Sequence, residues 1–220
     1  NIQVIQNMIY IISSVMFILG RKMLGKEATA VKGNYLSALA MFFAVAITCL
    51  SLEIDIKIIL AGVLLGGLIG SLIAVKVKMT AIPEMVALFN GFGGLATFLI
   101  AWSQFNEPDN SMFQHVLVML TIYIGGITFS GSLIAYGKLS EKLKLGKGSM
   151  ITNVFISFFY LSMPALIYVV IEPSLAGFVP QVPSYFSIFL VLTLIAGIGF
   201  VMPIGGGDMP VVISLLNSLS

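Results

Sequence analysis

The chain has 220 residues, of which 59% are hydrophobic and only 9% are charged, and its formal net charge is +2. A soluble domain carries about 25% charged residues, so most of this surface must face lipid or other helices rather than water. The small net charge, without a basic patch that contains aromatic residues, argues against nucleic acid as a partner, and the single cysteine, Cys49, excludes a disulfide within the chain.

Apolar runs long enough to cross a bilayer as helices, which takes about 20 residues, follow one another along the chain. Seven are complete: 3–20, 35–52, 56–75, 84–102, 116–136, 151–171 and 185–202. An eighth begins near Met209 and stops with the chain. We therefore predict an all-α, polytopic transmembrane helix bundle that forms a single domain over residues 1–220. Because the chain opens with Asn1 and ends within an apolar segment at Ser220, we expect it to be a piece of a longer protein.

The basic residues predict the orientation of these spans. Ten of the eleven lie in the alternate loops 21–34, 76–83 and 137–150, whereas the loops 103–115 and 172–184 contain no Lys or Arg. Positively charged loops stay on the inner side of a membrane. The N-terminus is therefore expected outside, and the regular alternation supports the number of spans.

Glycines gather within several spans. They fall four residues apart at Gly62, Gly66 and Gly70, and they cluster at Gly91, Gly93 and Gly94 and at Gly125, Gly126 and Gly131. Small residues allow the backbones of membrane helices to approach closely. We expect most of these glycines to serve tight helix packing.

Uncharged polar residues occur at bilayer depth, where polar groups are costly unless they face the bundle or water. They are Asn90 in the fourth span, Thr128, Ser130 and Ser132 in the fifth, and Ser214 and Asn217 in the eighth. Such side chains both donate and accept hydrogen bonds but do not ionise. Each alone is typical of contacts between helices, and together they favour a shared polar path.

The stretch 203–210 predicts a sharp turn between the seventh and eighth spans. Pro203 should end the seventh helix, and Asp208 is placed to cap the next one, with Pro210 in its first turn. The glycines that allow an unusual turn are Gly205, Gly206 and Gly207. No βαβ unit surrounds them, so they are not a dinucleotide-binding fingerprint.

The sequence shows no catalytic or metal-binding constellation. We find no Cys/His cluster, nucleophile elbow or P-loop. The single histidine, His115, begins the fifth span on the predicted outer side, where a surface position is the default interpretation. Glu84 begins the fourth span near the inner side, either as a first-turn acid favoured by the helix dipole or as a proton-entry group.

Three segments resemble the beta subunit of proton-translocating NAD(P) transhydrogenase. They are 78–91 (KMTAIPEMVALFNG), 128–139 (TFSGSLIAYGKL) and 206–218 (GGDMPVVISLLNS), and they follow in family order at family-like spacing. The resemblance covers essentially the whole chain. It implies a membrane domain that conducts protons and couples their passage to hydride transfer between NAD(H) and NADP(H), both bound in soluble domains outside this segment.

The resemblance also implies partners. A ninth span and an NADP(H)-binding domain would follow this segment, and the alpha subunit would supply membrane helices and the NAD(H)-binding domain. The family forms a dimer of protomers. The expected location is a bacterial plasma (inner) membrane, with the mitochondrial inner membrane as the alternative.

The resemblance assigns roles to particular residues. The proton path would be lined by Asn90, Ser132 and Asn217, with Thr128 and Ser130, and the contact with the NADP(H) domain would involve Asp208, Gly205, Gly206, Gly207 and Glu84. Many family members have a histidine at the position of Asn90, and it is thought to take up the proton. Asparagine does not titrate, so we expect the protonatable group to come from a helix of the alpha subunit.

Two other functions remain open from the residues. One is a secondary transporter or ion channel for a small solute, which Gly- and Pro-interrupted helices near polar groups would suit, although no inverted repeat is visible. The other is a noncatalytic subunit of a respiratory assembly. A nucleotide-binding domain after the ninth span would favour the transhydrogenase, whereas further spans would favour a transporter.

Overall fold

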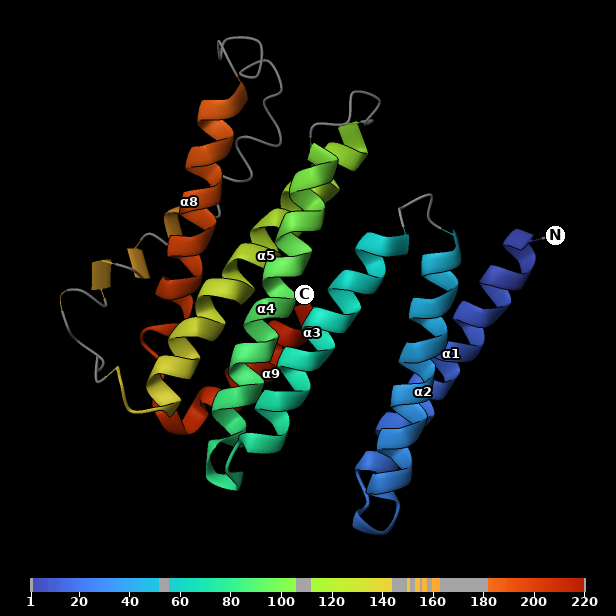
Figure 1. Ribbon diagram of the computed structural model, residues 1–220. Coiled ribbons are helices and arrows are strands. Elements are labelled where there is room, and N and C mark those ends of the chain that lie inside the picture. The colour runs from blue at the N-terminus through green and yellow to red at the C-terminus, as the bar shows by residue number, and fades with distance from the viewer. Residues whose placement is uncertain are drawn as a thin grey trace. The chain divides into compact units, whose positions relative to one another are not determined.

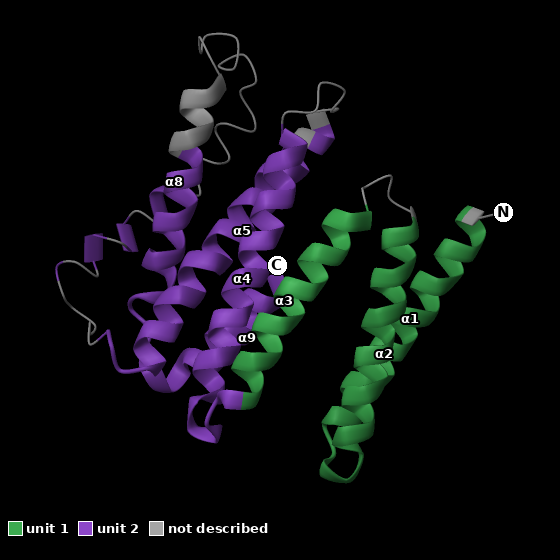
Figure 2. Ribbon diagram, viewed as in Figure 1, with its two compact units in different colours: residues 1–75 green, residues 76–220 purple. Residues whose placement is uncertain are grey.

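The computed structural model describes residues 2–51, 56–105, 112–143, 150, 153–154, 156–157, 160–162 and 182–219. Every regular element within these ranges is a helix, as the sequence predicts. The chain divides into two compact units, residues 1–75 and 76–220 (Figure 2). Each unit is described by itself.

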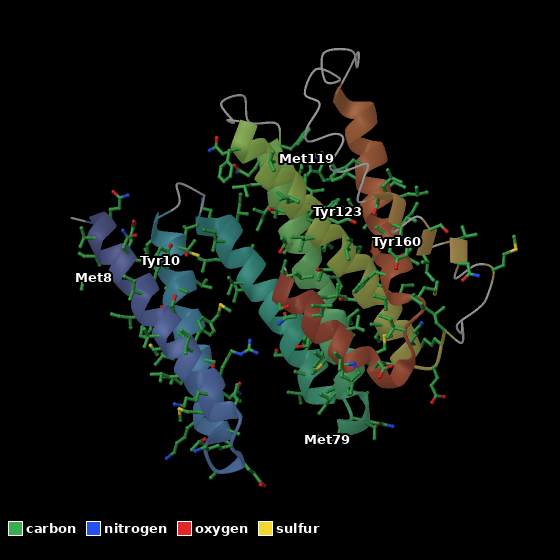
Figure 3. All side chains as sticks on the ribbon, turned by 180° about the vertical axis from the view of Figure 1, so that it is seen from behind. Met8, Tyr10, Met79, Met119, Tyr123 and Tyr160 are labelled. Carbon is green, nitrogen blue, oxygen red and sulfur yellow. The ribbon has the colours of Figure 1, made fainter. Side chains whose placement is uncertain are left out.

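In the first unit, α1 (Ile2–Leu24) and α2 (Glu27–Ser51) form an antiparallel hairpin. Near the turn the backbones approach closely, because a methyl group on Gly33 would lie 2.7 Å from the carbonyl oxygen of Gly20. At the other end the Tyr10 hydroxyl lies 2.9 Å from Thr48 Oγ1. Figure 3 shows Tyr10 well along α1 from the turn. Glycine contacts at one end and a polar contact at the other therefore fix the register of the hairpin.

The third helix of this unit, α3 (Ile56–Lys76, whose last residue belongs to the second unit), has no buried residue. Its glycines Gly62, Gly66 and Gly70 have no described atom of their own unit within 4 Å of a methyl group built on them. The packing predicted from their regular spacing is therefore not found within this unit.

The second unit contains α4 (Ile82–Phe105), α5 (Met112–Leu139), α8 (Val182–Val201) and α9 (Met209–Leu219). Short 3₁₀ turns at Met79–Ala81 and Gly206–Asp208 lead into α4 and α9. Helices α4 and α5 run antiparallel, so Met79 and Met119 lie at opposite ends of the unit (Figure 3). Helix α5 lies between α4 and α8 and runs parallel to α8 (Figure 1).

Glycines bring these helices into backbone contact. A methyl group on Gly94 of α4 would lie 2.7 Å from Thr128 Cβ of α5, and one on Gly125 of α5 would lie 2.7 Å from the backbone nitrogen of Phe98. On the other side of α5, a methyl group on Gly197 of α8 would lie 2.5 Å from the carbonyl oxygen of Ile127. Close packing at the predicted glycine clusters of α4 and α5 is confirmed, except at Gly93, which meets no described atom.

Five helices of the described chain are long and apolar enough to cross a membrane: Gln3–Leu24, Glu27–Leu50, Ile56–Lys76, Met79–Phe105 and Val116–Leu139. They overlap the first five predicted spans, but the second begins at Glu27 rather than near residue 35, so most of the predicted loop 21–34 is helical. A bent pair, Phe189–Val201 and Gly206–Leu219, follows with an angle of 108° between its halves. The structure thus confirms an all-helical membrane protein with several spans, while most of the predicted span 151–171 lies outside the described residues.

The bend between α8 and α9 lies where the sequence places it. Helix α8 ends at Val201, two residues before Pro203, and α9 begins at Met209. Pro203 lacks the N–H that would continue the first helix, and Pro210 stands in the first turn of the second, where a missing N–H costs little.

Candidate functional site

Asn90 is held in the second unit by a polar contact between α4 and α5. It lies two turns into α4, which starts with Pro83 and an acidic residue in its first turn. Its Nδ2 donates a hydrogen bond to Oγ of Ser132, 2.8 Å away, and both side chains are buried. The neighbouring Gly91 permits this approach, because a methyl group there would already lie 3.2 Å from Ser132 Cβ.

A pocket of about 700 Å³ lies beside Asn90, between α4 and α9. From α4 it is lined by Ile82, Pro83, Val86, Phe89, Asn90 and Gly93, and from α9 by Pro210, Ile213, Ser214 and Asn217. It therefore extends from the first turns of both helices to the two asparagines. An asparagine amide has two donor hydrogens and two acceptor lone pairs, and Asn90 uses one donor on Ser132. Its remaining hydrogen-bonding capacity is available to water in the pocket.

The amphipathic pattern of α9 explains why Ser214 and Asn217 reach this pocket. Its buried residues are Met209, Val212, Ile213 and Leu216, which follow one face at helical spacing. Leu216 packs on Gly131 of α5, where a methyl group would lie 3.2 Å from its Cδ1. With that face held against the core, the polar residues one position further along remain exposed and line the pocket.

Of the residues predicted for the path, Asn90 and Asn217 line this pocket, and Ser132 is linked to it through its hydrogen bond with Asn90. Thr128 and Ser130 do not line the pocket. Thr128 is fully buried, and its Oγ1 lies 3.5 Å from the carbonyl oxygen of Leu216, to which it donates. Ser130 donates to the carbonyl oxygen of Gly126 at 2.9 Å, and its hydroxyl is packed against Gly197 of α8. The structure therefore brings together Asn90, Ser132 and Asn217, leaves Thr128 one turn away, and directs Ser130 toward α8.

The glycine turn and Asp208 lie at the end of the unit where α5 and α8 end. Gly205, Gly206, Gly207 and Asp208 are all exposed. The predicted side-chain cap is not found, since the Asp208 carboxylate makes no hydrogen bond to a described residue. Instead its backbone N–H donates to the carbonyl oxygen of Gly205 at 3.1 Å. The physical reason is Pro210, which removes one of the two N–H groups that an aspartate at this position would cap.

Glu84 is half-buried in the first turn of α4, as predicted, but it does not line the pocket. The adjacent residues Pro83 and Val86 do. Its carboxylate therefore lies near the end of the pocket rather than inside it.

Sequence reasoning missed two features of this region. Ser214, which the sequence marked as polar at bilayer depth but to which no role in the path was assigned, lines the pocket, and its spacing of three residues from Asn217 already places both on one helix face. Lys138 contacts the end of α8, and its position as the only base in the last turn of α5 was the available indication.

Several long apolar helices with a buried polar pair and a partly polar pocket define a multi-pass α-helical membrane protein. The family model of the NAD(P) transhydrogenase beta subunit matches residues 6–220, so the chain belongs to that family. It is also similar to two curated sequences of NAD(P) transhydrogenase subunit beta from Rhodospirillum rubrum, one of them from a particular strain. Each is 34% identical over 223 residues, which cover 96% of this chain and 46% of the relative. The chain thus spans just under half the length of these relatives.

Proposed function

We propose that this chain is the proton-conducting membrane part of an NAD(P) transhydrogenase, an enzyme in which proton translocation is coupled to hydride transfer between NAD(H) and NADP(H). The observation that carries the proposal is the buried bond of 2.8 Å between Asn90 and Ser132 at the wall of a pocket that Asn217 also lines. Membership of the beta-subunit family supports it.

The pocket suits water better than a fixed ionic ligand. Its lining side chains are apolar or uncharged, and amides and hydroxyls both donate to and accept from water. A file of water can pass a proton, but none of these groups can hold one. We therefore propose that the titrating group is supplied by a membrane helix of the alpha subunit.

The exposed turn around Asp208 is proposed to contact the NADP(H)-binding domain. A carboxylate that has no hydrogen-bond partner within the described chain is available to form an ion pair with a Lys or Arg of that domain. In this role Gly205, Gly206 and Gly207 allow the turn to adjust, and Glu84 lies at the same end of the pocket.

The rest of the assembly follows from the same proposal. The chain has seven complete spans and the start of an eighth, with the N-terminus outside, in a bacterial plasma (inner) membrane or, alternatively, a mitochondrial inner membrane. It works with the alpha subunit and its NAD(H)-binding domain, with the NADP(H)-binding domain, and as a dimer of protomers. Both nucleotides bind outside this segment.

The test is reconstitution of the complete complex into vesicles, with acidification driven by NADPH and an NAD analogue. We expect the wild type to acidify the vesicles. Asn90→Leu should lose this activity, and Ser132→Ala should lower it about fivefold, the effect of about 1 kcal/mol from one buried hydrogen bond. Ser103→Ala is the matched control, because among the described residues that exposed hydroxyl of α4 donates only within its own helix, to the carbonyl oxygen of Ile100 at 2.7 Å.

Hydride transfer should be measured in the same vesicles. A protonophore removes a pH gradient but cannot reopen a blocked path, so it should not restore turnover of the Asn90→Leu complex. Acidification by Asn90→Leu at the wild-type rate would refute the proposed path.

A secondary transporter or ion channel is the alternative, and the 108° break between α8 and α9 favours it, because discontinuous helices line many transporter sites. The same vesicles separate the two functions. Proton movement that needs no nucleotide, or solute uptake down a proton gradient, would favour the transporter.

A further inference from the structure

We propose that Lys138 is a positioning residue: its ammonium group holds the bend between α8 and α9 and so keeps the polar residues of α9 beside Asn90. This inference rests on the proposed function for its meaning, since the pocket matters only if it conducts. The contacts themselves lie within one unit of the structure.

Lys138 lies in the last turn of α5, and its side chain reaches the end of α8. Its Nζ donates to the carbonyl oxygens of Val201 at 3.3 Å and Ile204 at 2.7 Å, and also to that of Met202. A lysine ammonium has three donor hydrogens and no acceptor. The number of donors therefore equals the number of carbonyl oxygens it meets.

These carbonyl oxygens need donors because α8 stops here. The last carbonyls of any helix have no partner within that helix, and Pro203 offers no N–H. Met202 and Ile204 receive no backbone N–H from a described residue, whereas Val201 receives that of Ile204 at 3.1 Å. Unpaired carbonyls are costly where water is scarce, and the C-terminal end of a helix dipole attracts a cation.

The connection itself does not fix the angle between the two helices. Gly205 and Gly207 meet no described atom within 4 Å of a built methyl group, and Gly206 meets only the Lys138 carbonyl oxygen, at 3.9 Å. Three exposed glycines leave the backbone free to turn. The angle therefore depends on contacts on either side of the glycines, and on the α8 side these are the hydrogen bonds of the Lys138 ammonium group.

The bend that Lys138 holds affects the pocket by setting the position of α9. From the 108° bend, α9 returns to lie against α4 and α5, with Leu216 on Gly131 and Ser214 and Asn217 at the pocket. A bend that opened by a fraction of this angle would move Asn217 away from Asn90. Lys138 thus acts on the pocket without lining it.

The experiment measures the exposure of the buried face of α9 in the complete complex. Cys49, the single cysteine among these 220 residues, is replaced by alanine, as is any cysteine elsewhere in the full-length chain, and Val212→Cys introduces a thiol at a position that is 6% exposed. Its rate of modification by a water-soluble maleimide is followed on this chain by mass, beside nucleotide-driven acidification.

Lys138→Met, which keeps length but has no donor, should raise the labelling rate about tenfold, as expected for a loss of charged hydrogen bonds, and should lower acidification. Lys138→Arg retains a cation and should restore both. Lys142→Met is the matched control: among the described residues that exposed lysine contacts only Tyr136, at 3.3 Å from its hydroxyl, and its loss should change neither readout.

If the Lys138→Met complex does not assemble, the labelling rates of the Lys138→Gln and Lys138→Arg complexes are compared instead. Glutamine keeps two donors but loses the charge, whereas arginine keeps both donors and charge. Labelling of the glutamine variant at the arginine variant's rate would overturn the proposal, as would unchanged labelling in an assembled methionine variant. The labelling needs no proton pumping. A wild type that does not pump would therefore refute the proposed function alone, and a pumping complex with unchanged labelling would refute the role of Lys138 alone.

Discussion

Replacing Gly94 by alanine tests one of the two closest glycine contacts between the two helices that carry the candidate site. The added methyl group would lie 2.7 Å from both Cβ and Cγ2 of Thr128 and 2.8 Å from the backbone nitrogen of Phe129. Threonine is branched at Cβ and has little freedom to turn away within a helix, and the backbone of α5 cannot yield locally. Helices α4 and α5 must therefore separate.

The magnitude follows from two opposing effects. Alanine favours a helix over glycine by about 1 kcal/mol, whereas an extra methyl group in a packed interface costs about 1–3 kcal/mol, so Gly94→Ala should be destabilising by up to about 2 kcal/mol. The adjacent Gly93 has no described atom within 4 Å of a built methyl group. Gly93→Ala keeps the helix benefit without the clash, and it should be neutral or slightly stabilising.

The assay is reversible unfolding of the purified protein in mixed micelles, with helix content followed as the fraction of denaturing detergent rises. A destabilisation of about 2 kcal/mol is about a thirtyfold change in the unfolding equilibrium. Equal stability of the two alanine variants would refute the reasoning, because the two positions differ only in what the methyl group meets.

Three further changes test other contacts. Gly197→Ala should destabilise the contact between α5 and α8 at least as much as Gly94→Ala, because the methyl group would lie 2.5 Å from the Ile127 carbonyl oxygen; unfolding in mixed micelles measures it. Tyr10→Phe removes the bond of 2.9 Å to Thr48 between α1 and α2 and should cost only about 0.6 kcal/mol, typical of such bonds in membranes, by the same assay. Asp208→Asn should impair acidification by the reconstituted complex while leaving its assembly, measured by size-exclusion chromatography, intact.

Controls keep these three outcomes distinct. Gly207→Ala, at an exposed glycine that meets no described atom, should leave stability unchanged. Serine in place of Gly197 should be no better than alanine. A Tyr10→Phe variant weakened by several kcal/mol would show that the ring itself, rather than its hydroxyl, had been displaced. Normal acidification by Asp208→Asn would contradict the role given to the turn.

The positions of helices along the chain could be predicted because the solvent imposes them. A lipid-crossing helix needs about 20 apolar residues, so apolar runs marked five described helices, and Pro203 marked the end of α8. The 108° angle that follows could not be read in the same way. It depends on the contacts of Lys138 with α8 and of Leu216 with Gly131, and these join residues far apart in sequence.

The direction in which each helix presents its polar side chains was predicted less well than the position of the helix along the chain. Thr128 and Ser132 are four residues apart and share a face of α5, whereas Ser130 lies two residues from each and faces α8. Helical periodicity alone separates these faces. The partners of each face are another matter, because packing between membrane helices depends on local shape rather than on hydrophobicity. The bond between Asn90 and Ser132 therefore required the structure.

The direct backbone contacts of α5 with α4 and α8 have a mechanical consequence. Where glycines stand between helices, no layer of flexible side chains can accommodate a sliding or rolling movement. Helices α4, α5 and α8 should therefore move as one unit. Helix α9 packs on α4 and α5 through one face. Any opening and closing of a water route along its other face would then be a movement of α9 relative to the other three helices, which keep their positions.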